Sequence, residues 1–360
     1  MKQAGYPPDR FFLMHIYNGY VKNGDLVPAE FFRLEDVTSL VMKNQDVTAN
    51  KEVLLKDVLQ SGQEPTRPIG EHCHSPFECD YKKHCWANIP ENSVFDLYLA
   101  RGKEWKLYQA GITALSQIPD DFDLNPRQQL QVRGAKYGEP YADIQSIRNF
   151  LEPLKGPLYF FDFETIQSAI PLLNGSRPFE KIPFQYSLHI SDIEGNLITH
   201  KEFLANTEEF NTDHTDPRLS LIRQMKKDIA DEGTILAYNA SFEIGVLKNL
   251  AAHFEEERAF LEGLINRIVD LLVPFKNAWY YLPAMGGSAS IKKVLPAIAP
   301  EFSYADLAIN EGELASNTFL KMINGSLSGN DAEIREQLLK YCKRDTEGML
   351  VIYRHLRGLI

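Results

Sequence analysis

The sequence has few cysteines, no excess of basic residues and no long apolar run. Segment 265–274, one of its longest apolar stretches, falls well short of the roughly 20 residues that a membrane-spanning helix needs. The first eight residues lack the apolar centre of a secretory signal. We therefore expect a cytoplasmic protein that makes no use of a membrane.

Basic residues are outnumbered, with 38 Lys and Arg against 49 Asp and Glu and a net charge of −11. This balance counts against a protein that coats nucleic acid without specificity. It leaves open an enzyme whose acidic residues hold metal ions and whose binding groove is locally basic. A length of 360 residues, 44% of them hydrophobic, predicts more than one domain.

Three of the four cysteines, Cys73, Cys79 and Cys85, are spaced Cys-x5-Cys-x5-Cys. They lie in segment 63–90, which is rich in Pro, Gly and His and reads as irregular. In a reducing cytosol such a cluster favours a metal site over disulfides, and three thiolates with a nearby histidine could hold zinc. Free thiols in a loop are the alternative. Cys342 is expected to be a buried residue of the last helix and no ligand.

The cysteine spacing resembles the C-terminal cluster of Cas4-like and AddB-like nucleases of the RecB family. That resemblance implies an iron–sulfur cluster, but residues 1–70 contain neither the further cysteine nor the nuclease core that accompany it. We interpret residues 1–92 as the mainly helical rear part of such a region, with an incomplete site. An upstream nuclease region or a separate subunit would supply the remainder.

Residues 93–156 are interpreted as a helical connector. Two short helices, broken at Gly111, are expected over 93–118, and one more near 141–152. Segment 107–115 resembles the helix–glycine–helix turn that follows RecB-type nuclease cores. Arg127, Arg133 and Lys136 come shortly afterwards and could guide a nucleic-acid strand, although ordinary solvated charges explain them more simply.

From residue 158 onwards, predicted strands alternate with predicted helices. The expected strands cover 158–163, 184–191, 197–204, 234–238 and 267–272. The expected helices cover 216–231, 241–254 and 332–357, with another that starts near Ser290. Three strands in succession, followed by strands separated by helices, is the element order of an RNase H-like α/β domain with a mixed sheet flanked by helices. We expect that domain over residues 157–360.

Acidic residues come at the ends of these elements. Asp162 and Glu164 are two apart on one strand, so they share a face, and paired carboxylates there are suited to Mg²⁺. Glu243 opens a helix, where an acid is also explained by the helix dipole. Tyr341 and Asp345 are four apart on the last helix and share its face. Taken singly, each has a plain alternative as a surface or packed side chain.

Together these residues resemble the DEDD exonuclease superfamily in its tyrosine subtype. The first motif, Asp-x-Glu-Thr, is met by Asp162, Glu164 and Thr165. The second, Asn-x-x-Phe-Asp, is met by Asn239 and Phe242, with Glu243 where Asp is usual. The third, Tyr-x-x-x-Asp, is met by Tyr341 and Asp345.

The resemblance implies two Mg²⁺ or Mn²⁺ ions and hydrolysis of phosphodiester bonds. Asp162 would be shared by both ions, Glu164 and Asp345 would hold the ion with the attacking water, and Glu243 would lie around the other. Tyr341 would orient the water. The residues expected to contact the substrate are Thr165 (through its backbone N–H), Asn239, Phe242 and Lys292, and Asp270 is a further candidate ligand.

Segments 157–165, 238–243 and 287–296 also resemble the bacterial family called domain of unknown function 2779, whose second motif commonly carries Glu. We therefore expect a metal-dependent 3′→5′ exonuclease that acts on a single-stranded 3′ end of DNA or RNA. The alternative is a catalytically inactive nucleic-acid-binding module within a larger DNA-processing protein. A third reading has the cysteine segment docking a partner protein.

Overall fold

A computed structural model describes residues 8–211, 215–302, 304, 306–327 and 330–360. The chain divides into two compact units. The first runs up to Asn88 and includes Ser168–Phe179, and the second comprises Ile89–Gln167 and Glu180–Ile360. The second unit thus takes in the expected connector as well as most of the expected exonuclease region.

The first unit is built from short elements. Strands β1 (Phe12–Ile16) and β2 (Phe32–Asp36) pair antiparallel. None of the residues of α3 is buried, so this helix is not stabilised by packing into a core. The helices of this unit are α1 (Pro28–Phe31), α2 (Thr38–Lys43), α3 (Gln45–Ser61) and α4 (Lys82–Cys85), with the 3-10 turn η2 (Glu71–Cys73).

The second unit contains a five-stranded mixed sheet in the order β6-β5-β4-β7-β8. Neighbours β4 (Leu158–Ile166), β5 (Ile182–Ser191) and β6 (Leu197–Leu204) are antiparallel, whereas β7 (Thr234–Ala237) and β8 (Ile268–Asp270) run parallel to β4. All five strands lie where the sequence predicts them, within a few residues. The α/β class and the mixed sheet flanked by helices are confirmed.

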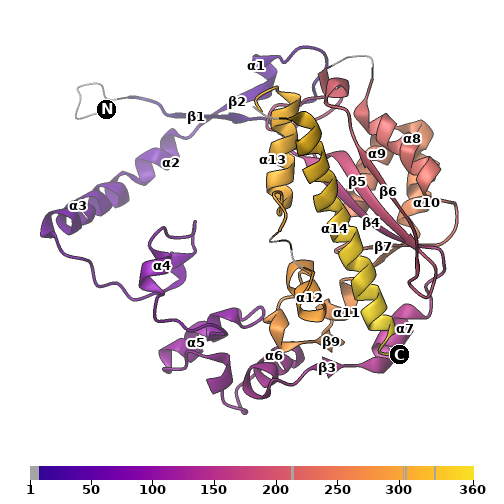
Figure 1. Ribbon diagram of the computed structural model, residues 1–360. Coiled ribbons are helices and arrows are strands. Elements are labelled where there is room, and N and C mark those ends of the chain that lie inside the picture. The colour runs from indigo at the N-terminus through magenta and orange to yellow at the C-terminus, as the bar shows by residue number, and fades with distance from the viewer. Residues whose placement is uncertain (1–7, 212–214, 303, 305, 328–329) are drawn as a thin grey trace. The chain divides into compact units, whose positions relative to one another are not determined.

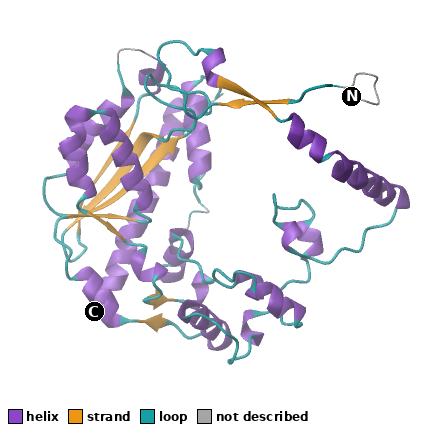
Figure 2. Cartoon of the chain, turned by 180° about the vertical axis from the view of Figure 1, so that it is seen from behind, coloured by secondary structure: helices purple, strands orange, loops and turns teal. Residues whose placement is uncertain are grey.

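Helices cover both faces of this sheet (Figures 1 and 2). One face packs on α8 (Pro217–Asp228), α9 (Ser241–His253) and α10 (Arg258–Ile265), and their apolar side chains form one core with the rings of Phe161 and Phe163. The other face is covered by the long α14 (Asp331–Arg357) and by α13 (Gly312–Ile323). The three layers explain why all ten residues of β5 are buried.

The connector is part of the same unit and has a small core of its own. Strands β3 (Tyr141–Ala142) and β9 (Tyr280–Tyr281) pair antiparallel and join it to the later part of the chain. The other helices are α5 (Lys103–Gln109), α6 (Pro126–Tyr137), α7 (Ile144–Leu151), α11 (Val273–Lys276) and α12 (Ile291–Ile298). The 3-10 turns are η3 (Val94–Asp96), η4 (Leu115–Gln117), η5 (Thr207–Asn211), η6 (Glu255–Glu257) and η7 (Pro283–Met285).

Across the described ranges, we find no helix with the length and apolar character needed to cross a bilayer.

Candidate active site

A cavity of about 230 Å³ lies where β4, the end of β7, α9, α12 and α14 meet. Elements that are far apart in the sequence therefore contribute to one site. The cavity is lined by Asp162, Phe163, Glu164, Tyr238, Phe242, Ile291, Lys292, Tyr341, Asp345 and Met349.

The alternation of β4 directs its acids into this cavity. Asp162 and Glu164 lie on the face that α14 covers, while Phe161 and Phe163 pack in the core on the opposite side. The prediction that the two carboxylates share a face is confirmed. In the ladder, Asp162 stands opposite Ser187 and Glu164 opposite Gln185, so the neighbours of the acids on β5 are polar too.

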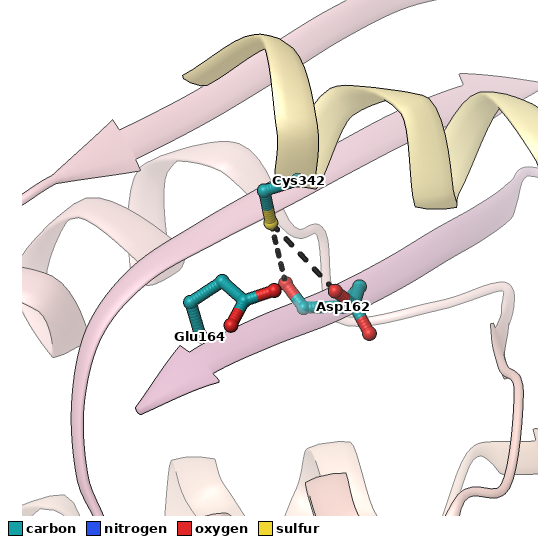
Figure 3. Close-up of side chains that lie close together, drawn as sticks. All are labelled: Asp162, Glu164 and Cys342. Carbon is teal, nitrogen blue, oxygen red and sulfur yellow. Dashed lines mark hydrogen bonds between the residues drawn. The ribbon is translucent and has the colours of Figure 1, made fainter. Parts of the chain in front are cut away.

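Helix α14 brings three side chains to the acids of β4. Tyr341 and Asp345, one turn apart, line the cavity, and Cys342 lies between them in sequence. The Cys342 Sγ is 3.7 Å from Asp162 Oδ2 and 3.8 Å from the Asp162 carbonyl oxygen. Asp162, Glu164 and Cys342 each offer a ligand atom, all within 4.8 Å of one another (Figure 3).

The carboxyl groups raise one another's pKa values. Burial, followed by the charges of Asp345, Glu243 and Glu164, raises the pKa of Asp162 well above its usual range. Burial and Asp345 do the same for Glu164. Burial also raises the pKa of Asp345, to about 6, against the lowering effects of a hydrogen bond and of Lys292. So many carboxylates cannot all be ionised in one small space unless cations lie between them.

Glu243 is buried in the first turn of α9 and, unlike the other three expected acids, is not among the residues that line the cavity. Burial raises its pKa to about 8, and the charge of Asp270 adds to the shift. Its Oε2 is buried and has no hydrogen-bond partner among the described residues. An unpartnered buried carboxyl oxygen is costly, and a cation is one means of satisfying it.

Cys342 is buried, as predicted. Burial and then Asp162, Glu164 and Asp345 raise the pKa of its thiol, so the sulfur stays protonated and can donate to Asp162. A neutral thiol is a poor ligand for hard ions such as Mg²⁺, which prefer oxygen. Cys342 therefore lies beside the carboxylates. That it is no metal ligand stays a prediction.

Two residues of the site carry no motif and were not predicted. The Tyr304 hydroxyl donates a hydrogen bond of 2.6 Å to Asp345 Oδ1, which fixes that carboxyl group. Gly312 begins α13, and a Cβ there would lie 3.7 Å from Glu164 Oε2 and 3.8 Å from the Tyr341 hydroxyl. Tyr304 precedes α13 and Gly312 begins it, and this helix was not predicted, although its buried Ala315, Phe319 and Ile323 have helical spacing.

Of the four residues expected to contact the substrate, two line the cavity and two do not. Phe242 and Lys292 line the cavity, and the Lys292 Nζ lies 6.0 Å from the ring centroid of Tyr341 and donates to the Asn310 carbonyl. Asn239 is exposed, just outside this lining, in the left-handed conformation with φ of +67°. Thr165 was placed after the strand, but it lies inside β4, at an irregularity of the ladder, because β4 runs on to Ile166.

Asp270 ends β8 and supports the turn beside Glu243. Its Oδ1 accepts hydrogen bonds from the backbone N–H groups of Asn239 at 2.9 Å and Leu272 at 3.0 Å. These bonds explain its position without a metal. A role for Asp270 as an additional ligand stays a prediction.

A buried polar network holds α14 on the sheet one residue after Asp345. The Thr346 hydroxyl lies 2.7 Å from the Ser187 hydroxyl and 2.8 Å from His189 Nδ1, and Ser187 lies 2.9 Å from His200 Nε2. Burial lowers the pKa of His189 to about 3, so this ring is neutral and acts as a hydrogen-bonding group. The network fixes the rotation of α14, and with it the direction of Asp345.

The three remaining cysteines lie in the first unit. Cys73 is buried, Cys79 is half-buried and Cys85 is exposed. In the part of the chain that the structure describes, they do not form a group with ligand atoms within 4.8 Å of one another. An iron–sulfur cluster or zinc ion at these residues stays a prediction.

One family model matches part of the second unit. Residues 159–290 match the family model described as Domain of unknown function (DUF2779). The match begins in β4 and ends directly before α12, and so contains the first two acidic motifs. No solved structure matches the chain.

Three curated relatives carry the name uncharacterized protein. Protein MG366 of Mycoplasma genitalium is 27% identical over 241 residues, which are 61% of this chain and 35% of the relative. Its homolog in Mycoplasma pneumoniae is 27% identical over 58% of this chain and 33% of the relative, and protein UU173 of Ureaplasma parvum is 26% identical over 60% and 33%. The matched region spans about a third of each relative.

Proposed function

We propose that this protein is a metal-dependent 3′→5′ exonuclease whose second unit is an RNase H-like domain of the DEDD type. The observation that carries the proposal is the meeting of Asp162, Glu164 and Asp345 in one cavity with Tyr341. A surface cluster of acids would repel and spread, whereas these are held together by buried elements at the cost of raised pKa values.

The donor set fits hard divalent cations. It consists of carboxylates, it carries more negative charge than its surroundings neutralise, and the buried Glu243 Oε2 lacks a partner among the described residues. Asp162, Glu164 and Asp345 would hold the ions, with Glu243 behind them. Bound Mg²⁺ or Mn²⁺ would make a water nucleophilic and stabilise the oxygen that leaves.

The protein's own groups would position the reactants. The Tyr341 hydroxyl lies among the acids, where it can hold a water by a hydrogen bond. Tyr304 keeps the Asp345 carboxyl group in one orientation through its 2.6 Å bond. Lys292 brings a positive charge to the edge of the cavity, where it would meet a substrate phosphate, and the ring of Phe242 offers a surface for the terminal base.

The role of the first unit is a separate proposal. We infer that residues 1–92 are the rear part of a Cas4/RecB-like region whose cysteines once completed an iron–sulfur or zinc site. The chain matches only about a third of each relative, which leaves room for such a region in those proteins. The activity proposed for the second unit does not depend on it.

Single-stranded DNA and RNA oligonucleotides, labelled at either the 3′ or the 5′ end, test the proposal. They are incubated with the full chain in Mg²⁺, Mn²⁺ or EDTA. We expect a 3′ label to be released as a mononucleotide at once, a 5′ label to remain on a shortening ladder, and EDTA to stop both. Binding without degradation in either metal would favour the inactive nucleic-acid-binding module instead.

A further inference from the structure

A second and larger cavity, of about 730 Å³, lies in the same unit as the acidic cavity. Its walls are the segment from Asp96 to Leu99 and the loop from Gly286 to Ile291. Tyr238 and Ile291 line both cavities, so the larger one, here called the connector groove, lies next to the cavity of the acids. Its volume lies within the range of roughly 300–1,000 Å³ that is usual for ligand sites.

One buried side chain of α6 ties both walls of the connector groove together. The Gln131 Nε2 donates to the carbonyl oxygens of Asp96 at 2.7 Å and Gly286 at 3.3 Å, and its Oε1 accepts from the Tyr98 N–H at 2.8 Å. Gly287 has a φ of +79°, and a Cβ there would be 2.3 Å from Gln131 Nε2. The groove is therefore built into the fold, which lowers the entropic cost of binding a ligand.

The floor of the groove combines an aromatic ring with positive charge. The Arg127 guanidinium carbon is 3.6 Å from the ring centroid of Tyr98, and its N–H groups donate to the carbonyls of Lys276 and Gly287. Lys276 is exposed and adds a second cation. The acid of the lining, Asp96, already accepts hydrogen bonds from the Ser93 N–H and hydroxyl.

A hydrogen bond fixes the end of the groove that lies next to the acidic cavity. The Tyr238 hydroxyl donates a 2.6 Å hydrogen bond to the Ala289 carbonyl, which joins the loop to the end of β7. Two non-glycine residues of the lining have positive φ, Leu99 at +42° and Asn239 at +67°. Such conformations are costly and persist where the surroundings impose them, often at ligand sites.

We propose that the connector groove binds the nucleotides of a single-stranded nucleic acid that lie next to its 3′-terminal nucleotide. This inference rests on the proposed exonuclease function. A guanidinium group stacked on an aromatic ring, together with an exposed lysine, is suited to unstacked bases and their phosphates. A base pair would keep its faces stacked, so a duplex would not use this floor. The connector would then be a part of the substrate site as well as a spacer.

Two substitutions in the full chain test the groove, each with a matched control. Lys276→Glu reverses an exposed charge in the groove, and Lys248→Glu makes the same change at an exposed site of α9 that does not line the groove. Tyr98→Leu removes the ring but keeps an apolar side chain, and Tyr137→Leu does so at an exposed site at the end of α6. Circular dichroism of each variant checks that it folds.

The readouts are hydrolysis in Mn²⁺ and binding in Ca²⁺, both measured with a dinucleotide and with a single strand of about eight nucleotides, a typical length for such grooves. We expect Kd for the longer strand to rise roughly five- to a hundredfold in Tyr98→Leu and at least tenfold in Lys276→Glu, with a much smaller change for the dinucleotide. In Lys276→Glu, the slope of the logarithm of the binding constant against the logarithm of the salt concentration should also become shallower by about 0.7. This is the value for one phosphate contact on a single strand. The controls should behave like the wild type.

The outcomes separate the groove from the activity. One outcome is that both substrates are hydrolysed and that strand length has no effect on Kd or rate. Another is that Lys276→Glu and Lys248→Glu change Kd equally. Either result would overturn the groove and leave the exonuclease proposal standing. Binding of the longer strand that needs Tyr98 and Lys276, without any hydrolysis, would support the groove and overturn the exonuclease. Failure to bind either strand would overturn both.

Discussion

The acidic site and the cysteine segment were predicted in the same way, from spaced residues with ligand chemistry, but they differ in structure. The acids are carried by β4, by α9 on one face of the sheet and by α14 on the other, all of them elements with buried residues. The cysteines are carried by η2, α4 and the chain between them, with Cys85 exposed. The first set is brought together, and the second does not form a ligand group within the described residues.

The difference shows what makes a sequence motif dependable. A residue on a long buried element has its direction fixed by the period of that element and by the core behind it. A residue in an irregular segment has no such support, so regular spacing along the chain does not bring side chains together. The comparison predicts that the acids are essential to the activity and that the three cysteines are not.

Asp162→Asn should have the largest effect. The amide keeps the shape but removes a charge from a site that must bind cations, so we expect Mn²⁺ binding to be lost and turnover to fall by a factor on the order of 10³ or more. Calorimetric Mn²⁺ titration and a single-turnover degradation assay measure the two quantities. Asp231→Asn, an exposed change in the same unit, is the control. Activity like that of the wild type in Asp162→Asn would end the metal proposal.

Tyr341→Phe should have a smaller effect of a different kind. It removes one hydroxyl that positions a water but no metal ligand. We expect a rate loss of about 1–3 kcal/mol, or roughly ten- to a hundredfold, with Mn²⁺ affinity nearly unchanged. The same two assays distinguish it from Asp162→Asn. Loss of Mn²⁺ binding would show that Tyr341 has been given the wrong role.

Tyr304→Phe tests a residue that only the structure indicates. It removes the 2.6 Å hydrogen bond to Asp345 Oδ1 and leaves the ring in place. Groups that hold a ligand in position usually contribute about ten- to a hundredfold to metal affinity, and we expect the lower value here because Asp345 is also held by its buried helix. Mn²⁺ affinity should fall and the rate at saturating Mn²⁺ should recover. The opposite pattern, a slower rate with unchanged affinity, would contradict this role.

The sheet and its acids could be predicted because strand and helix periods are local properties of the sequence. The shared face of Asp162 and Glu164 followed from alternation alone. Tyr304 and Gly312 could not be found in this way, since neither belongs to a motif and their partners in the site are remote in sequence.

The connector shows the same limit. Helix α6 went unpredicted, although it carries the residues that shape the groove. Its pattern is weak because buried glutamines, Gln128 and Gln131, occupy core positions where apolar residues would be expected. Both bond the backbone of the segment from Asp96 to Leu99, and Gln131 also bonds the Gly286 carbonyl; such pairing cannot be deduced from local sequence. That Arg127 guides a nucleic-acid strand stays a prediction, and it is now part of the proposed groove.

Replacement of Cys73, Cys79 and Cys85 together by serine should have the smallest effect on degradation. The three lie in the first unit, and every residue that lines the acidic cavity lies in the second, so we expect the rate to stay within about twofold of the wild type, the size of ordinary surface changes. Iron and zinc content is measured in parallel. The matched change Cys342→Ser alters one sulfur that contacts Asp162, and its Mn²⁺ affinity should shift where that of the triple variant does not. If the triple variant loses a stoichiometric metal but keeps its rate, the cysteines form a separate site. If it loses most of its activity, the two regions act together and the contrast between them is wrong.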